Sequence, residues 1–221
     1  MISKILVSFF SLAAVVLASC TKEPSFDYPE GTVGSSRVTN FAKFDVSGTP
    51  VMSIVMGSTF TDPGVKAKEG ETEIPVTVTG SVNPNTVGLY TLTYSATNKD
   101  GFTATSERIV VVLPAAEQDG IDLSGEYLPI GGAPSNATIT KVAKGVYYTT
   151  NCWGGGSLAV IPAYFICVDG STVIIPEQDP GSGRIVTQSP GTYSGGMITW
   201  TVIRLDFPGG PLVRTKQWQK L

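Results

Sequence analysis

The chain has 221 residues, of which 42% are hydrophobic and 15% are charged, and its formal net charge is −3. This balance favours folded over disordered protein, and the small net charge excludes nucleic acid as a partner. The sequence contains no histidine, which removes Ser-His-Asp and Cys-His catalytic groups and every His-based zinc or iron site. We therefore expect a protein without catalytic activity, cofactor or metal.

The first element is an apolar N-terminal segment. Lys4 precedes the apolar run 5–16, and residues 17–20 read Leu-Ala-Ser-Cys. This run is too short for a membrane span and is typical of a secretory signal peptide, which we predict over 1–19. The four residues that end at Cys20 resemble the lipobox of bacterial lipoproteins, in which the signal is cut before the cysteine and its thiol is acylated.

The lipobox resemblance implies that Cys20 is the lipid attachment site and that the membrane is a partner through N-terminal acyl chains. An ordinary secreted protein, with Cys20 placed by chance after a cleavage site, is the alternative. We expect a lipid-anchored protein of the outer membrane at the cell surface, with the periplasmic face as the other orientation. The segment 20–38 is rich in Pro, Gly, Ser and charge and is predicted to be a flexible tether.

A first β-domain is predicted over 39–114. Residues 89–96 alternate with period two, which predicts a half-buried antiparallel strand with Tyr90, Leu92, Tyr94 and Ala96 on one face. The sequence Asn-Lys-Asp-Gly at 98–101 predicts a turn, and the β-branched run 103–112 is expected to return as the second strand of a hairpin. Shorter runs at 51–55 and 74–79 complete a small sandwich.

Motifs in this domain carry a family resemblance. Residues 57–65 read GSTFTDPGV, residues 87–90 read VGLY, residues 94–98 read YSATN, and the closing strand contains ERIVV at 107–111. This pattern is similar to the bacterial Ig-like domain that occurs repeatedly in surface proteins. The chain departs from the family pattern at Asn98, where an acidic residue is usual. The resemblance implies an Ig-like β-sandwich that serves as a spacer or presenting module.

Residues 115–120 form a predicted linker, and a second β-domain is predicted over 121–221. About eight short strands at roughly 8–12-residue spacing favour a barrel or a sandwich. The predicted strands are 125–130, 137–142, 145–152, 159–168, 172–175, 184–188, 197–206 and 215–220. No helical period is present, so the expected fold class is all-β, with an Ig-like sandwich followed by a lipocalin-like β-barrel or sandwich.

This second domain carries a resemblance of its own. Its motifs are GVYY at 145–148, WGGG at 153–156, IPEQ at 175–178, GTY at 191–193 and ITW at 198–200. They resemble the lipocalin-like C-terminal β-domain of Bacteroidota lipoproteins, which is often associated with polysaccharide utilisation. The family's own function is uncharacterised, so the resemblance implies a location and a context more than an activity.

Two cysteines remain, Cys152 and Cys167, both in strand-like runs. An oxidising compartment allows them to form a disulfide, although a disulfide also requires Cα atoms within about 7 Å. The alternative is a pair of buried free thiols that behave as small hydrophobic side chains. We favour the unpaired thiols because nothing in the sequence sets the register between the two strands.

Aromatic residues concentrated in the second domain suggest ligand binding, because flat rings suit the apolar faces of sugars. Trp153 precedes three glycines that cannot bury it locally, so we predict that it faces a ligand together with Tyr148 and Tyr164. Tyr147 and Tyr148 must point to opposite faces of a strand, so at most one of them packs inward. Core packing is the alternative for each of these rings.

We expect a non-catalytic accessory protein that binds or presents a glycan or similar nutrient. One alternative is a structural module that contacts an outer-membrane protein partner, and another is a lipocalin-like carrier of a small apolar ligand. A pair of carboxylates across a cleft, as in glycoside hydrolases, is the arrangement that would indicate an enzyme instead.

Overall fold

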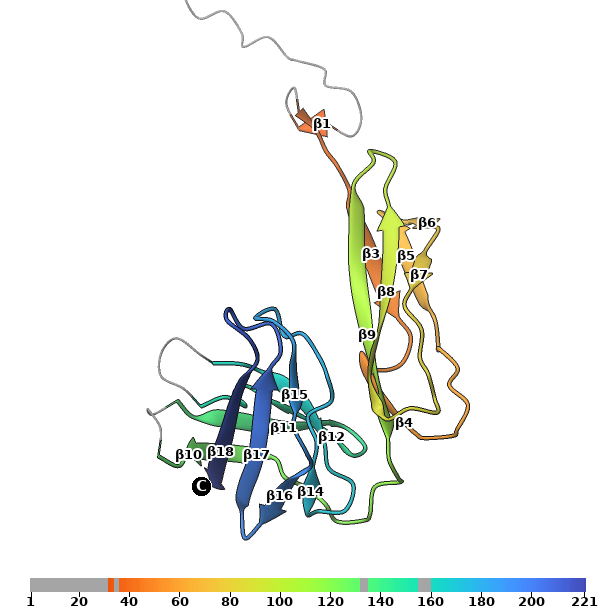
Figure 1. Ribbon diagram of the computed structural model, residues 1–221. Helices are drawn as coiled ribbons and strands as arrows, with labels where there is room; N and C mark the ends of the chain where they lie inside the picture. Colours follow the sequence, from red (N-terminus) through yellow and green to blue (C-terminus); the bar gives the residue numbers. More distant parts are fainter. Residues whose placement is uncertain (1–31, 34–35, 132–134, 155–159) are drawn as a thin grey trace, which may run out of the picture. The chain divides into compact units, whose positions relative to one another are not determined.

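The computed structural model describes residues 32–33, 36–131, 135–154 and 160–221, and all of its elements in these ranges are β-strands (Figure 1). The chain divides into two compact units, Met1–Asn40 and Phe41–Leu221. In the first unit, β1 (Thr32–Val33) pairs antiparallel with β2 (Ser36–Arg37). Within the described ranges, no helix has the length and apolar character that crossing a membrane requires.

The N-terminal part of the second unit consists of two small sheets. One has the order β3-β5-β6 and the other the order β4-β9-β8-β7, in which only the β4–β9 pair is parallel. The strands are β3 (Ala42–Val46), β4 (Val51–Val55), β5 (Val65–Glu69), β6 (Thr72–Ile74), β7 (Thr77–Thr79), β8 (Gly88–Thr97) and β9 (Thr103–Leu113). Two facing sheets of this kind agree with the predicted Ig-like sandwich.

The β8–β9 hairpin forms as its sequence predicts. Its register pairs Thr97 with Thr103, and the Asn98 side chain accepts hydrogen bonds from the Asp100 and Phe102 amides at 3.1 and 2.8 Å. Gly101 adopts a positive φ of 86°, which closes the turn at little steric cost. The predicted alternation along β8 is confirmed, because Leu92, Tyr94 and Ala96 are buried whereas Thr91 is exposed.

A buried ionic network joins the elements of this sandwich. Arg108 of β9 is fully buried, and its Nε lies 3.2 Å from Asp62 Oδ1 and donates to the Tyr94 hydroxyl at 3.1 Å. Tyr94 in turn donates to Asp62 Oδ2 at 2.8 Å. The two terminal nitrogens of Arg108 donate to the carbonyl oxygens of Thr49 and Ser47, each at 2.7 Å. The charge is therefore both paired and hydrogen-bonded, as burial requires.

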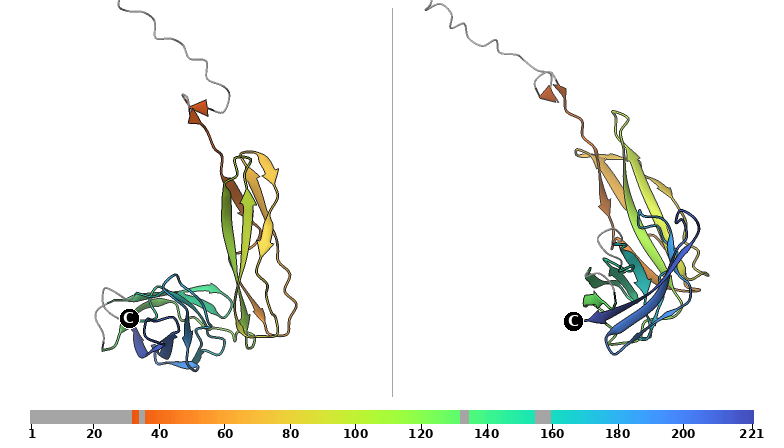
Figure 2. Two further views of the ribbon diagram at one scale, coloured as in Figure 1. Left: turned by 45° about the horizontal axis from the view of Figure 1, so that its top comes forward. Right: turned by 60° about the vertical axis from the view of Figure 1, so that its left-hand side comes forward.

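The C-terminal part forms one nine-stranded sheet that almost closes on itself. Its order is β13-β12-β11-β10-β18-β17-β16-β14, and β15 pairs with β17 outside this path. An isolated bridge joins β13 to the residue that follows β14: the Ile166 amide donates to Ile174 O at 2.8 Å, and the Ile174 amide donates to Ile166 O at 3.0 Å. This bridge connects the two ends of the path, so the predicted all-β, barrel-like fold is confirmed (Figure 2).

Most of the predicted strands in this part are present. The sheet consists of β10 (Gly125–Pro129), β11 (Ala137–Ala143), β12 (Val146–Thr149), β13 (Ala163–Ile166), β14 (Thr172–Val173), β15 (Ile185–Thr187), β16 (Gly191–Ser194), β17 (Met197–Arg204) and β18 (Leu212–Lys220). The sequence does not predict β16, which lies between Pro190 and two glycines and is short. A Cβ on Gly191 would lie 2.4 Å from Thr199 O, so glycine allows the close approach of β16 to β17.

Large side chains fill the interior of the barrel-like sheet. Within the described residues, the core cluster contains the aromatic rings of Tyr127, Tyr147, Trp153, Phe165, Trp200 and Trp218, none more than 5% exposed. Phe165 stacks on Tyr147 with ring centroids 5.3 Å apart and meets the Trp200 ring nearly edge-on at 5.4 Å. The interior is therefore packed by side chains, which argues against the lipocalin-like carrier of an apolar ligand.

The Arg108 network gives a prediction for stability. Replacing Arg108 by Met removes the cation that pairs with the Asp62 carboxylate and the donor to the Ser47 and Thr49 carbonyls. We therefore expect a loss of about 3–5 kcal/mol in the free energy of unfolding. Urea denaturation of the chain from residue 20 onward measures this loss. As a control, Lys66→Met removes an exposed ion pair to Glu73 at 3.6 Å, and should change stability by less than about 1 kcal/mol. Equal effects of the two substitutions would contradict the assigned role.

Candidate functional site

Tyr148 and Tyr164 form an outward-facing pair of rings on neighbouring strands. They lie directly opposite each other in the β12–β13 register, and their ring centroids are 5.1 Å apart at an interplanar angle of 57°. Both side chains are partly exposed, whereas the preceding Tyr147 is fully buried. The prediction that the two consecutive tyrosines of β12 face opposite sides is therefore confirmed, and Tyr148 is the outward one.

The Gln178 side chain holds Tyr164 in place from outside the sheet. The Tyr164 amide donates to Gln178 Oε1 at 2.8 Å, and Gln178 Nε2 donates to the Tyr164 carbonyl at 2.8 Å. Gln178 thus satisfies both backbone groups of Tyr164, as a partner strand would. Because these groups point away from β12, Tyr148 and Tyr164 form a non-hydrogen-bonded cross-strand pair, the kind in which side chains lie closest.

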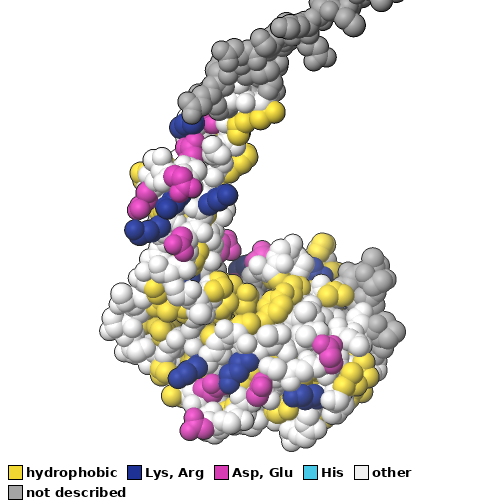
Figure 3. Space-filling model, turned by 180° about the vertical axis from the view of Figure 1, so that it is seen from behind, with side chains coloured by type: hydrophobic (Ala, Val, Ile, Leu, Met, Phe, Trp, Pro, Cys, Tyr) yellow, Lys and Arg dark blue, Asp and Glu magenta, His cyan; other side chains and the backbone are white. Residues whose placement is uncertain are grey.

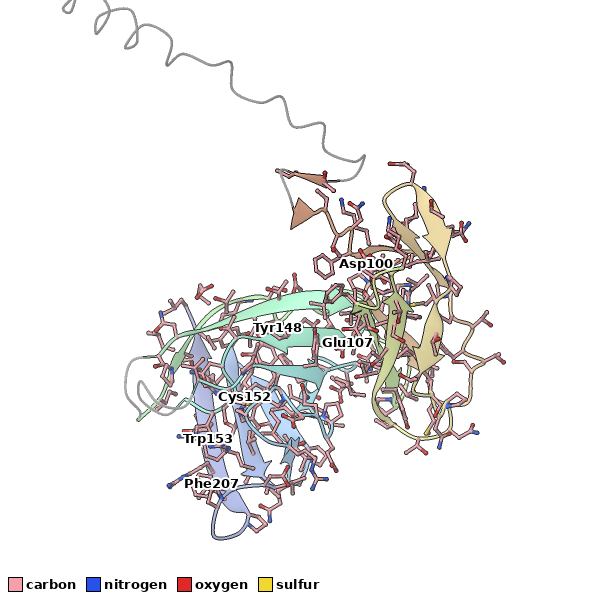
Figure 4. The ribbon with its side chains drawn as sticks, turned by 90° about the horizontal axis from the view of Figure 1, so that it is seen from above. Asp100, Glu107, Tyr148, Cys152, Trp153 and Phe207 are labelled. Carbon is pink, nitrogen blue, oxygen red and sulfur yellow. The ribbon has the colours of Figure 1, made fainter. Side chains whose placement is uncertain are left out.

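A cavity of about 290 Å³ lies against these two rings. One wall comes from β8 and β9 and the others from β12, β13 and the segment after β14. The lining residues are Leu89, Thr91, Glu107, Ile109, Tyr148, Pro162, Ala163, Tyr164, Gln178, Asp179 and Pro180. Figure 4 shows Tyr148 and Glu107 at the border between the two groups of strands. The volume is just below the range typical of small-ligand sites, about 300–1,000 Å³.

The wall from β8 and β9 is held in place by a hydrophobic cluster beside the cavity. Val111 and Leu113 of β9 are buried together with Val146, Ile166 and Val168 of the C-terminal part, and Leu89, Ile109 and Tyr164 pack against this cluster. The outward face of the β8–β9 hairpin is therefore apolar around the Leu89–Val111 pair, where it contacts the C-terminal part. Residues of the Ig-like sandwich and of the barrel-like sheet build the cavity together.

The polar groups around the cavity have distinct roles. Asp179 Oδ1 accepts hydrogen bonds from the Gly181 and Gly183 amides at 2.8 and 3.2 Å, which fixes the carboxylate at a turn. Glu107 is exposed on β9. Burial, with a further contribution from Tyr148, raises the pKa of the Tyr164 phenol, which is therefore neutral at physiological pH and able to donate a hydrogen bond.

A second hollow of about 410 Å³ lies near Tyr90 but offers fewer aromatic groups to a ligand. Tyr90 is the only aromatic residue in its lining, and its hydroxyl already donates to Thr86 O at 2.9 Å. On the face of the molecule in Figure 3, acidic and basic side chains are interspersed around hydrophobic patches rather than gathered into blocks of one sign. The paired tyrosines and their cavity are therefore the candidate site.

Trp153 does not lie where its sequence context predicts. Its ring is 5% exposed and belongs to the core cluster, with the Arg204 guanidinium 5.9 Å from the ring centroid. The Trp153 and Gly154 amides both donate to Asn151 Oδ1, at 3.1 and 3.0 Å. This turn directs the ring into the sheet interior, away from Tyr148 in Figure 4. The expectation of an open loop tryptophan is therefore wrong.

Cys152 and Cys167 are both buried and unpaired, so the two residues do not form the disulfide that was considered. Burial raises the pKa of the Cys152 thiol to about 12 and also raises that of Cys167. Both thiols therefore stay protonated at neutral pH and are poor nucleophiles. They behave as small hydrophobic side chains of the core, which is the alternative that we favoured.

The remaining predicted site residue, Cys20, lies outside the described residues. Within the described ranges, no group of three or more Cys, Asp or Glu side chains is arranged to hold a metal ion. Acidic residues of the second domain mostly serve local structure. Asp169 accepts two turn amides and the Thr172 hydroxyl, and these hydrogen bonds lower its pKa to about 2 despite partial desolvation.

The sequence alone does not identify Glu107, Ile109 or Gln178 as site residues. Glu107 and Ile109 alternate with buried residues along β9, and that alternation could have placed them on the outward face. Gln178 has no comparable signal, because its partner is the backbone of a residue 14 positions earlier in the chain. Only the assembled tertiary structure brings these side chains to Tyr148 and Tyr164.

Comparison with known proteins identifies the first β-domain. The family model of the bacterial surface protein Ig-like domain matches residues 44–112, about a third of the chain. The chain therefore contains a bacterial surface Ig-like domain. No curated protein matches it.

Solved structures provide distant likenesses over most of the chain. A lipoprotein from Bacteroides thetaiotaomicron is 20% identical with a TM-score of 0.38, covering 81% of this chain and 100% of that one. The M60 catalytic domain with two CBM51 domains of Clostridium perfringens ZmpB is 13% identical with a TM-score of 0.33, covering 83% and 21% of the two chains. A CBM51-2 structure with GlcNAc and INT domains from the same protein is 15% identical with a TM-score of 0.31, covering 80% and 42%.

The Gln178 contacts predict a local effect on Tyr164. In Gln178→Ala the Tyr164 amide loses its acceptor, so we expect its hydrogen exchange to accelerate by about tenfold or more, with a stability loss of about 1–3 kcal/mol. Exchange measured by NMR or mass spectrometry tests this. The control is Gln188→Ala. Gln188 is exposed and its backbone amide donates to Thr201 O at 2.9 Å, but within the described residues its side chain makes no hydrogen bond. Unchanged exchange at Tyr164 would contradict the positioning role of Gln178.

Proposed function

We propose that this chain is a lipid-anchored, non-catalytic protein of the bacterial cell envelope that binds a saccharide at Tyr148 and Tyr164. The envelope location is supported by the bacterial surface Ig-like domain at residues 44–112 and by the lipobox-like segment that ends at Cys20. We also propose that the protein is anchored in the outer membrane and exposed at the cell surface. Capture of a nutrient glycan is the role that suits this placement.

The observation that supports saccharide binding best is the tilted pair of tyrosine rings at the cavity. Pyranose rings have apolar C–H faces that pack on aromatic rings, and their hydroxyls require hydrogen-bond partners around the edge. Tyr148 and Tyr164 supply the rings, and Glu107 and Asp179 supply acceptors in the same lining. A cavity of about 290 Å³ suits one sugar unit, with the rest of a longer chain outside.

The same geometry favours binding over hydrolysis. A glycosidase needs one carboxyl group kept protonated, usually by burial, opposite a second ionised one. Glu107 and Asp179 are both exposed, so neither has the buried setting that a glycosidase gives its acid. Neither of the two buried thiols is in the lining of the cavity. Contact with an outer-membrane protein stays an alternative, which predicts stable co-purification of that protein and no saccharide affinity.

The proposal predicts that the two rings are hot spots. Tyr148→Ala and Tyr164→Ala should each weaken saccharide binding by about 1–3 kcal/mol, while Tyr148→Phe keeps the ring and most of the affinity. The signal-free chain is screened by affinity electrophoresis in gels containing neutral glucans, mannans, xylans and galactans. Calorimetry with matching oligosaccharides then gives the dissociation constants.

Phe207→Ala is the matched control. The Phe207 ring is exposed, and its centroid lies 5.2 Å from the Arg204 guanidinium carbon. Phe207 is not in the lining of this cavity. It should leave the affinity unchanged. If both tyrosine variants are folded and keep the affinity, the saccharide binds at another place on the protein. Absence of binding to every saccharide tested would reject the proposed function.

The anchoring part of the proposal has a separate test. Two or three acyl chains on Cys20 give effectively permanent membrane attachment, because each buried methylene contributes about 0.8 kcal/mol. We expect the native chain in the membrane fraction, with acylated Cys20 as its first residue by mass spectrometry, and Cys20→Ser in the soluble fraction. An unmodified thiol at Cys20 in the native protein would reject the lipid anchor.

A further inference from the structure

We infer that the cavity at Tyr148 and Tyr164 accepts neutral and amino-bearing saccharides and rejects those that carry carboxylate groups. This inference rests on the proposed saccharide binding and specifies the ligand class. The charged members of the lining are Glu107 and Asp179, and all the other lining residues are uncharged. A uronic acid in the cavity would therefore face two carboxylates and no cation from the lining.

Arg204 donates to Ser182 O at 2.7 Å in the Asp179 turn, but its guanidinium lies against the Trp153 and Phe207 rings and is not in the lining. The two arginines closest in sequence to the carboxylates are engaged with other groups. Arg108 follows Glu107, but alternation along β9 turns its side chain to the opposite face, where it is buried against Asp62. Arg184 lies closest in sequence to Asp179, but it pairs with Glu177 at 2.8 Å and with Asp206 at 3.1 Å. That cluster has one positive and two negative charges, so it adds no positive field.

The two carboxylates come from different parts of the fold and are held independently. Glu107 lies on β9, whose register with β8 extends over the full hairpin, and Asp179 lies in a turn closed by the Gly181 and Gly183 amides. Both line the cavity, so a protonated amine on a sugar bound there gains an attraction that a hydroxyl at the same position lacks. A carboxylate at that position meets repulsion of similar size.

Matched oligosaccharides test the ligand class. The probes are tetrasaccharides in the gluco, manno and galacto configurations, each compared with its uronate counterpart, and the amino counterparts in the gluco and galacto series. We expect each uronate to bind about five- to twentyfold more weakly than the neutral sugar of the same configuration. We expect the amino sugar to bind several-fold more tightly, by an amount that decreases as salt rises from about 0.05 to 0.5 M.

Charge-neutral variants supply the control that isolates the electrostatic effect. Glu107→Gln and Asp179→Asn keep the shape of each side chain, and asparagine at 179 retains an oxygen for the two glycine amides. The double variant should bring the neutral, amino and uronate affinities within about twofold of one another. Lys216→Gln, a substitution on β18 outside the lining, should change none of the ratios.

The outcomes separate the two proposals. A uronate that binds as tightly as its neutral counterpart overturns the inferred ligand class and leaves saccharide binding in place. Discrimination that persists in the double variant also overturns it, because the two carboxylates would then not be the cause. Failure of every probe to bind the folded, unsubstituted chain overturns the proposed function and, with it, this inference.

Discussion

The buried contact between Arg108 and Asp62 is the interaction on which the Ig-like sandwich and the candidate site both depend. Arg108 lies on β9, while Asp62 precedes β5 of the facing sheet, so the ion pair ties the two sheets together. Tyr94 completes the network from β8. Because Arg108 is buried, losing this contact would leave an uncompensated charge in the interior, which is strongly destabilising. The network therefore specifies which face of β9 points inward.

The inward placement of Arg108 determines what β9 presents on its other face. Because side chains alternate along a strand, a shift by one residue would exchange the two faces. With Arg108 and Val110 inside, Glu107 and Ile109 face the cavity and Val111 faces the hydrophobic cluster shared with the barrel-like sheet. One strand of the Ig-like sandwich thus supplies a wall of the candidate site.

The barrel-like sheet contributes to the site from its outer surface. Its interior is occupied by the rings of Trp153, Trp200 and Trp218 and their neighbours, which leaves the outward rings of Tyr148 and Tyr164 for a ligand. Inward rings stabilise the sheet by burial. On the outer surface, Gln178 fixes the backbone of Tyr164, and β8 and β9 line the cavity beside both rings. The packed interior leaves no enclosed space for an apolar ligand, and the proposed saccharide site uses the rings on the outer surface.

The sequence alone determined the all-β class, the β8–β9 hairpin and the opposite orientations of Tyr147 and Tyr148, because these follow from local periodicity and turn chemistry. It also placed Tyr148 and Tyr164 among the candidate ligand residues. Only the tertiary structure decided that Trp153 packs inward, that the two thiols stay apart, and that Glu107 and Gln178 reach the tyrosines. Those outcomes depend on the register between distant strands, which local patterns do not encode.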